Sequence, residues 1–326
     1  MIKSQLSDIS YPIKEELNRF NELFKKSLKS NVGLVDLVTK FILKQKGKKI
    51  RPLLVLLSAK VAGGVNERSY RGAILVELLH TATLVHDDVV DNADKRRGFP
   101  SINAIWKNKI AVLMGDYLLS RGLMIAVEGK DFDFLGIVTD AVRRMSEGEL
   151  LQINKTRKLD IDEDTYFKII SDKTASLLAT CCEIGAVSAT DDIKLHAAMQ
   201  KFGENIGIAF QIRDDILDYI GSSSIIGKPL GGDIKEKKIT LPLIYSLKQA
   251  GKDEAGKILK IVKHADKKDD IKKVMDFVKE YRGIEYAVET ASRYSEQAKE
   301  QLDLFPDSAG RIALASLVDF ITERKN

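Results

Sequence analysis

One long apolar segment, residues 70–91, constrains the fold of this chain more than any other part of its sequence. Residues 77–91 contain no glycine or proline, so the segment is predicted to form an α-helix. Apolar side chains cover most of the circumference of that helix instead of one face, which is typical of a helix with protein on all sides. We therefore expect a buried central helix that other helices surround.

The rest of the chain is also predicted to be helical. Of its 326 residues, 44% are apolar, 7% are aromatic and only 6 are prolines, a composition that favours helices. Amphipathic spacing predicts further helices at about residues 13–29, 35–46, 134–154 and 308–324. No strand pattern, repeat array or low-complexity linker occurs. We therefore predict an all-α fold in which residues 1–326 form a single domain, a bundle of antiparallel helices around a central apolar cavity.

The predicted central helix ends in three carboxylates, Asp87, Asp88 and Asp91. On a helix, Asp87 and Asp91 lie one turn apart on the same face, about 6 Å along the axis, and Asp88 points to the side. Two carboxylates at this spacing repel each other unless a cation lies between them. Oxygen ligands on a rigid helix suit a hard ion that keeps some waters and shares a phosphate, so the pattern favours Mg²⁺ over Zn²⁺.

The same pattern returns 127 positions later, in Asp214, Asp215 and Asp218, and apolar residues again precede it at 206–210. A single cluster of this kind is as easily a solvated acidic face of a helix. Two clusters, each at the end of an apolar helix, are much harder to explain in that way. Together they predict an acidic mouth at one end of an apolar interior, with all six aspartates as metal ligands.

These motifs, in this combination and order, resemble those of the trans-isoprenyl diphosphate synthases, the polyprenyl synthetase family. In that family a basic pair follows the first aspartate motif, as Arg96 and Arg97 do here, and the resemblance extends from Gly47 to the C-terminal segment. It implies an isoprenoid synthase fold and a Mg²⁺-dependent enzyme of the long-chain type, such as an octaprenyl or heptaprenyl diphosphate synthase. The implied reaction is head-to-tail condensation of isopentenyl diphosphate with an allylic diphosphate to an all-trans polyprenyl diphosphate, a quinone side-chain precursor.

The resemblance also implies roles for basic and polar residues that would be ambiguous alone. Residues 47–52 would otherwise be an ordinary basic loop at a helix start, but in this family they hold isopentenyl diphosphate, through Lys48 and Arg51, with His80 as a further contact. Lys49 stands where arginine is more usual and receives no role. The implied catalytic residues are Asp87, Asp91, Lys173, Thr174, Gln211 and Asp214. The implied contacts to the allylic substrate or its diphosphate are Arg96, Arg97, Lys173, Thr174, Gln211, Lys228 and Lys238.

Product length is predicted from the residues one turn inward from Asp87, which are Ala82 and Thr83. An extended isoprene unit is on the order of 5 Å, close to the ~5.4 Å pitch of a helix, so each turn accommodates about one more unit. Short-chain members of the family have aromatic plugs at these positions, whereas both residues here are small. We therefore expect a product longer than geranylgeranyl. The tunnel floor is expected deeper, among Leu75, Val76 and Leu79 or on the helix with Leu123 and Met124.

Charge and cysteine content restrict the partners and the compartment. The net charge of +5 is spread widely, without the dense basic stripe that nucleic-acid binding favours. Cys181 and Cys182 are adjacent in an apolar stretch, so they are predicted to be small buried residues in a protein of the reducing cytoplasm. The N-terminus lacks the apolar core of a signal peptide, and no uninterrupted apolar run approaches ~18 residues, so no transmembrane segment is expected. The family implies a homodimer.

Two other functions stay open at this point. A class I terpene cyclase of the same helical class has a similar first aspartate motif. Its second metal site, however, normally mixes Asn or Asp with Ser or Thr and Glu, and it lacks the basic motif found here at residues 47–52. A non-catalytic subunit of a heteromeric prenyl synthase would be expected to have lost one aspartate cluster, and both are intact. Incubation with labelled isopentenyl and farnesyl diphosphates and Mg²⁺ would separate the three functions. A polyprenyl synthase would give a linear polyprenyl diphosphate, a cyclase a cyclic hydrocarbon, and a non-catalytic subunit no product.

Overall fold

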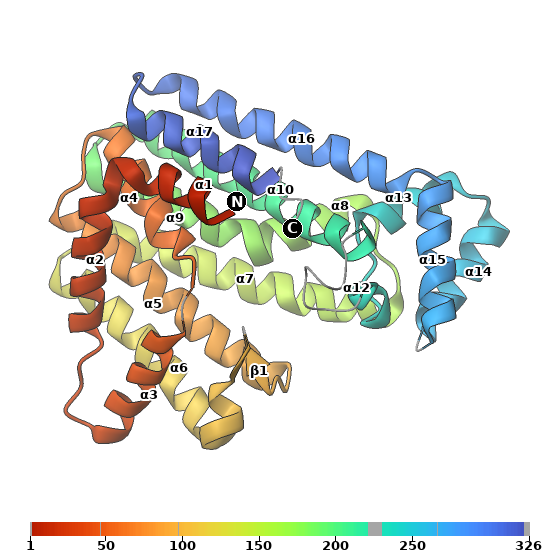
Figure 1. Cartoon of the computed structure of the whole chain (residues 1–326), viewed down its shortest axis with the longest axis horizontal. Helices are drawn as coiled ribbons and strands as arrows, with labels where there is room; N and C mark the ends of the chain where they lie inside the picture. Colours follow the sequence, from red (N-terminus) through yellow and green to blue (C-terminus); the bar gives the residue numbers. More distant parts are fainter. Residues whose placement is uncertain (1, 46, 97, 221–229, 266, 323–326) are drawn as a thin grey trace. The chain divides into compact units, whose positions relative to one another are not determined.

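The computed structural model describes residues 2–45, 47–96, 98–220, 230–265 and 267–322, and within them the chain is almost entirely helical (Figure 1). This confirms the predicted all-α fold. The α-helices are α1 (Ile2–Ser10), α2 (Lys14–Ser27), α3 (Gly33–Lys44), α4 (Ile50–Ala62), α5 (Glu67–Val90), α6 (Ile102–Glu128), α7 (Phe132–Lys158), α8 (Glu163–Ile170), α9 (Ser176–Ala189), α10 (Ile193–Ile220), α12 (Gly232–Lys235), α13 (Leu241–Gln249), α14 (Lys252–Lys263), α15 (Lys268–Glu280), α16 (Gly283–Gln301) and α17 (Ala309–Thr322). Short 3-10 turns lie at Tyr11–Ile13 and Leu302–Leu304, and a π-turn lies at Ser171–Ala175.

The chain folds into two compact units, each built from separate segments. Unit 1 comprises Met1–Thr139, Thr180–Met199 and Phe305–Leu314. Unit 2 comprises Asp140–Ala179, Gln200–Leu304 and Ala315–Asn326. The assignment of the whole chain to a single domain stays a prediction.

Helix α5 is the predicted central helix, and it is buried on every side in unit 1 along most of its length. Helix α6 lies beside it in Figure 1 (α5 orange, α6 yellow), and the two helices are in contact. Glycines in α6 allow that contact to be close. A Cβ at Gly115 would lie 2.1 Å from Nε2 of His86, and a Cβ at Gly122 would lie 3.2 Å from Cδ1 of Leu75. Larger residues at these positions would push α6 away from α5.

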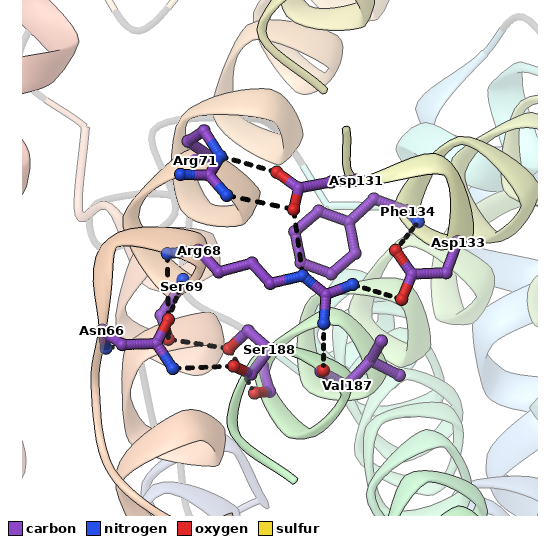
Figure 2. Close-up of polar contacts among 10 residues, drawn as sticks. Asn66, Arg68, Ser69, Arg71, Asp131, Asp133, Phe134, Val187 and Ser188 are labelled. Carbon is purple, nitrogen blue, oxygen red and sulfur yellow. Dashed lines mark hydrogen bonds and ion pairs between the residues drawn. The ribbon is translucent and has the colours of Figure 1, made fainter. Parts of the chain in front are cut away.

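A cluster of ion pairs fixes the start of α5 to neighbouring parts of unit 1 (Figure 2). The guanidinium of Arg68 donates to Asp131 Oδ1 at 2.9 Å, to the Val187 carbonyl at 2.9 Å and to Asp133. Arg71 donates to both oxygens of Asp131, at 2.6 and 3.1 Å. The Asp131 side chain is only 3% exposed, and it is therefore a buried carboxylate whose charge two arginines balance.

Unit 2 has its own apolar core, formed by residues from α8, α10, and α12 to α16. Its members on α10 include Ile212, Ile216 and Tyr219, which lie on the same helix as the second aspartate cluster. The lysines that follow residue 243 do not enter this core. As predicted for a solvated face, these side chains are exposed on or between α14 and α15: Lys257, Lys260, Lys263, Lys267 and Lys268.

One local prediction is wrong. The sequence indicated a loop and no strand at residues 96–101, but β1 (Lys95–Arg96) pairs antiparallel with β2 (Phe99–Pro100). Strands of two residues are too short to show the alternation of apolar and polar residues that identifies a strand in a sequence. Gly98 lies in the turn with φ +81°, a conformation that favours glycine. Ser101 follows and caps α6, as predicted, by accepting a hydrogen bond from the Ala104 N–H.

Two predictions about burial have different outcomes. Cys181 and Cys182 are buried free thiols, as predicted, and burial raises the pKa of Cys182 to about 12.

The sequence predicted no membrane-spanning segment, but α6 is long enough and apolar enough to cross a membrane, by length and composition alone. Only 33% of its most apolar window is buried. A long apolar helix of this kind is weak evidence for a membrane span, since helices of water-soluble proteins share these properties.

Candidate active site

Both aspartate clusters lie at the C-terminal end of a long helix. The first is at the end of α5 in unit 1, with Asp91 as the C-cap, and the second is in the part of α10 that belongs to unit 2. The C-terminal end of a helix has a partial negative charge, so carboxylates there are electrostatically unfavourable. A bound cation would reverse the sign of this interaction. The placement of two such clusters at helix C-termini therefore favours a cation-binding role over a structural one.

In the first cluster, Asp87 and Asp91 are exposed and Asp88 is buried. The Nε–H of Arg96 donates to Asp88 Oδ1 at 2.6 Å, and Asn103 donates to the Asp88 carbonyl at 3.2 Å. Asp88 therefore fixes the β1–β2 hairpin to the end of α5. Asp87 and Asp91, which their spacing predicted to share a helix face, are the two members of the cluster that face solvent.

The second cluster has the same division. Asp214 is exposed, whereas Asp215 is buried and accepts hydrogen bonds from Tyr166 Oη at 2.7 Å and Gln211 Nε2 at 2.8 Å. The two oxygens of Asp218 accept the backbone N–H groups of residues 232 and 233, each at 3.0 Å. Asp218 thereby fixes the start of α12 beside α10. Each carboxylate oxygen keeps a lone pair for a further ligand.

The electrostatics of the second cluster are unusual. Burial and, to a smaller extent, the nearby charge of Asp233 raise the pKa of Asp215 to about 8, against the opposing hydrogen bonds from Tyr166 and Gln211. Burial also raises the pKa of Asp233 to about 6, with a contribution from Asp218. Asp233 was not among the predicted site residues, because the sequence indicated a glycine-rich loop there, outside the aspartate motif; the structure places it in α12. Perturbed carboxyl groups of this kind are typical of functional sites.

A magnesium ion fits these residues if substrate and water complete its coordination. Among the described residues, no group of three or more His, Cys, Asp or Glu side chains is arranged to hold a metal ion by itself. Mg²⁺ seldom uses a cage made only of protein and usually binds one or two carboxylates together with substrate phosphates and waters. The exposed Asp87 and Asp91, one turn apart, and the exposed Asp214 offer such carboxylates.

Three of the predicted substrate residues lie close together in unit 2. Lys173 and Thr174 are in the π-turn, where Lys173 Nζ lies 2.5 Å from Glu149 Oε2 and 3.2 Å from Gln152 Oε1. The Thr174 hydroxyl donates to Gln211 Oε1 at 3.0 Å. Since Gln211 also donates to Asp215, hydrogen bonds connect the π-turn to the second aspartate cluster.

The basic segment leads into α4, which contacts α5 within unit 1. Lys48 is exposed and Arg51 is half-buried. Lys49, to which the sequence gave no role, has φ +49° at the N-cap of α4 and donates to Asn21 Oδ1. Burial lowers the pKa of Lys49, and the carboxylate of Glu77 partly offsets this effect. Glu77 is one helical turn before His80, so the basic segment and His80 belong to the same region of unit 1.

The other predicted residues have varied settings. Ala82 is 2% exposed, and Thr83 is half-buried with its hydroxyl donating to the His80 carbonyl at 2.9 Å. Lys238 pairs with Glu236 at 2.5 Å, and its charge offsets part of the rise that burial causes in the pKa of Asp233. Arg97 and Lys228 lie outside the described residues.

The sequence of this chain matches the family model of the polyprenyl synthetases over residues 33–278. The chain belongs to the polyprenyl synthetase family. It is 34% identical over 284 residues to the short chain isoprenyl diphosphate synthase of Methanothermobacter thermautotrophicus, with 86% of this chain and 87% of the relative covered. It is 31% identical over 309 residues to the octaprenyl diphosphate synthase of Haemophilus influenzae, covering 95% and 94%.

Solved structures agree with this assignment. A polyprenyl synthase from Caulobacter crescentus, complexed with calcium and isoprenyl diphosphate, has a TM-score of 0.89 and 33% identity, with 98% of each chain covered. The present chain is therefore a trans-prenyltransferase of isoprenoid biosynthesis with the fold of the polyprenyl synthases. Its activity is the head-to-tail condensation that forms a polyprenyl diphosphate. The polyprenyl synthetase prediction is confirmed, and the terpene cyclase alternative is not supported.

Proposed function

We propose that this prenyltransferase is Mg²⁺-dependent and makes an all-trans polyprenyl diphosphate longer than geranylgeranyl. The observation behind the metal requirement is the shared design of the two aspartate clusters. Each lies at the C-terminal end of a long helix, exposes its first carboxylate and buries its second in hydrogen bonds. The Caulobacter polyprenyl synthase was solved with calcium and isoprenyl diphosphate, which supports a divalent cation for this chain as well.

The aspartates are proposed to bind the cations as two sets: Asp87, Asp88 and Asp91, and Asp214, Asp215 and Asp218. When bound, Mg²⁺ would neutralise the charge that develops on the leaving diphosphate. The exposed Asp87, Asp91 and Asp214 supply oxygens directly. Hydrogen bonds orient the buried Asp88 and Asp215, and the lone pairs that these bonds leave unused are available to the cation.

Basic residues are proposed to hold the two diphosphates. Lys48 and Arg51, with His80, bind isopentenyl diphosphate. Arg96 uses only its Nε–H for Asp88, and a guanidinium has five N–H donors, so its terminal nitrogens can bind a phosphate of the allylic substrate at the same time. Arg97 and Lys228, which lie outside the described residues, and Lys238 keep their predicted phosphate-binding roles as parts of this proposal.

The residues of the π-turn are proposed to bind the ionising end of the allylic substrate. Lys173 donates from its ammonium group and Thr174 from its hydroxyl, with Gln211 between Thr174 and the second aspartate cluster. No side chain is assigned as the general base, and the released pyrophosphate accepts the proton that the condensation removes. The chain's own contribution is to bind, orient and balance charge.

A product longer than geranylgeranyl is proposed from the small residues Ala82 and Thr83, which precede Asp87 by about one turn. Leu75, Val76 and Leu79 are buried further along α5 towards its start. Met124 of α6 is 49% exposed, so it is a weaker candidate for the tunnel floor than these buried residues. A product of this length suits a quinone side-chain precursor, and the buried free thiols suit a cytoplasmic enzyme.

We also propose that the enzyme is a homodimer through α6. After a break in helical geometry at Lys107, this helix exposes apolar side chains at intervals that place them on one stripe: Val112, Leu113, Met124 and Val127. Leu113 is 55% exposed and has exposed apolar neighbours. Contiguous exposed apolar side chains are typical of protein–protein contact surfaces. A second copy of the same stripe is its simplest complement, since most soluble oligomers are symmetric and use one patch twice.

The dimer can be tested by a charge placed in the stripe. Leu113→Asp should give a monomer in sedimentation at micromolar concentration. Ile193→Asp is the matched control, because Ile193 is 77% exposed on α10, and it should leave the mass unchanged. A wild-type monomer with full activity would contradict the homodimer.

The activity assay uses the purified chain alone, with labelled isopentenyl diphosphate, farnesyl diphosphate and either Mg²⁺ or a chelator. We expect a linear polyprenyl diphosphate of more than four isoprene units that forms only with the metal. A cyclic hydrocarbon would indicate a terpene cyclase. No product from the folded protein would favour the non-catalytic subunit of a heteromeric synthase.

A further inference from the structure

The π-turn Ser171–Ala175 interrupts what would otherwise be a continuous helix from α8 to α9. The N–H of Ser176 donates to the carbonyl oxygen of Ser171, five residues back, which is the hydrogen bond that defines a π-turn. Such turns are rare and are frequently found at functional sites. This one contains Lys173 and Thr174, so its conformation determines where these two side chains lie.

A buried ion pair fixes the start of this turn. Asp172 is 6% exposed, and its two carboxylate oxygens accept from Arg144 Nε at 2.8 Å and Lys168 Nζ at 2.9 Å. Burial alone would raise the pKa of Asp172, but the hydrogen bonds from Arg144 and Lys168 outweigh it and lower that pKa. The carboxylate is therefore charged, and its charge is balanced within unit 2.

Arg144 connects this carboxylate to two further groups. One of its terminal nitrogens donates to Ser171 Oγ at 2.8 Å and to Glu204 Oε1, on α10, at 2.9 Å. Ser171 Oγ donates to the same Glu204 oxygen at 2.7 Å. A planar guanidinium can hold several acceptors in fixed directions, which a lysine ammonium cannot. Arg144 thus joins α7, the π-turn and α10.

Glycines bring α7 and α10 close to the turn. A Cβ at Gly148 of α7 would lie 3.0 Å from Asp172 Cβ and 3.1 Å from the Lys173 nitrogen. A Cβ at Gly207 of α10 would lie 2.5 Å from Ala175 Cα. The backbone of the turn is therefore packed between two helices, and Arg144 supplies the polar contacts at the same place.

We propose that Arg144 is a positioning residue for the allylic diphosphate. It acts through Ser171 and Asp172, which hold the π-turn so that the next two residues, Lys173 and Thr174, are presented to the substrate. Lys173 contacts Glu149 and Thr174 contacts Gln211, so the two side chains have partners different from those of Ser171 and Asp172. The inference rests on the proposed function, in which Lys173 and Thr174 bind the allylic diphosphate.

The test compares Arg144→Met with Arg143→Met. Arg143 is the neighbouring residue and also makes two ion pairs, with Asp140 and Glu147, but its side chain is 57% exposed. For each variant, calorimetry measures the dissociation constants of isopentenyl diphosphate and of a non-reactive thiolo analogue of farnesyl diphosphate. Hydrogen exchange measures the protection of the amides in residues 172–178.

We expect Arg144→Met to raise the dissociation constant of the analogue on the order of 10- to 100-fold, as for other residues that orient a binding group. Its affinity for isopentenyl diphosphate should be unchanged, and the amides of residues 172–178 should exchange faster. Arg143→Met should match the wild type in all three measurements. Arg144→Lys keeps the positive charge but lacks the planar set of N–H donors, so this variant should have an intermediate affinity for the analogue.

Wild-type affinity for the analogue in folded Arg144→Met would overturn the inference, and so would an equal loss for both ligands. If Arg144→Met does not fold, Arg144→Lys decides, and wild-type affinity and exchange in that variant would overturn it. A wild-type enzyme that binds the analogue but makes no polyprenyl product would refute the proposed function and leave this comparison of affinities intact. Wild-type protein that does not bind the analogue would refute both.

Discussion

Metal binding at the second aspartate cluster should depend steeply on pH between 6 and 8. In the metal-free protein the pKa of Asp215 is raised to about 8 from an ordinary value of 3.8, chiefly by burial. A divalent cation binds the ionised carboxylate, so below pH 8 it must first displace a proton from Asp215. Metal affinity should therefore rise with pH and level off above 8.

The size of the effect follows from that pKa. About 1% of Asp215 is ionised at pH 6 and about half at pH 8, so the affinity should increase about 50-fold between them, since each unit of pKa is 1.36 kcal/mol. At pH 7 about 0.9 proton should be released for each ion that binds. Asp233, with a pKa of about 6, should add a smaller dependence at lower pH.

The stability of the metal-free protein should change in the opposite direction. Because the pKa of Asp215 is higher in the folded chain than in the unfolded chain, the folded state holds the extra proton between about pH 4 and 8. The melting temperature should therefore fall as the pH rises through this range. Saturating Mg²⁺ should remove much of that fall by stabilising the ionised form.

Isothermal calorimetry with Mn²⁺ or Mg²⁺, in two buffers of different ionisation enthalpy, measures both the affinity and the protons released. Asp215→Asn should remove most of the pH dependence and leave only the smaller contribution of Asp233 near pH 6. Asp214→Asn is the matched control, because Asp214 is exposed; it should lower the affinity at every pH and preserve the slope. A wild-type affinity that is constant from pH 6 to 8, or a slope in Asp215→Asn as steep as that of the wild type, would refute the reasoning.

Three further predictions concern other parts of the enzyme. Lys48→Ala and Arg51→Ala should raise the KM for isopentenyl diphosphate more than the KM for the allylic substrate, and the reverse order in steady-state kinetics would mean that the two sites are exchanged. Ala82→Phe should shorten the product to farnesyl or geranylgeranyl length, and unchanged chromatograms of the dephosphorylated products would place the tunnel elsewhere. Asp131→Ala should lower the unfolding free energy by about 2 kcal/mol, because it removes a buried carboxylate that pairs with two arginines. The loss is limited because both arginines are partly exposed, so water can replace the lost contacts. Denaturant titration measures this change, and a stability equal to wild type would contradict it.

Most of the helical architecture could be predicted from the sequence, because local periodicity is sufficient for it. Residues 70–91 have the all-round apolar character of a buried helix, and α5 extends from Glu67 to Val90 and is buried as expected. The β1–β2 hairpin and the π-turn could not be predicted in this way. Two-residue strands have no period, and a π-turn depends on contacts with other helices, here those of Arg144 and Glu204.

The positions of the two aspartate clusters were likewise evident from the sequence, since the i, i+1 and i+4 spacing places two carboxylates on one helix face. The sequence could not show how the members of a cluster differ. Asp88 is buried because Arg96 of the hairpin pairs with it, and Asp215 is buried because Tyr166 of α8 packs and donates to it. Those partners are 8 and 49 residues away in the chain. Which carboxylate faces solvent and which one holds a proton therefore depends on packing between elements, which only the tertiary structure determines.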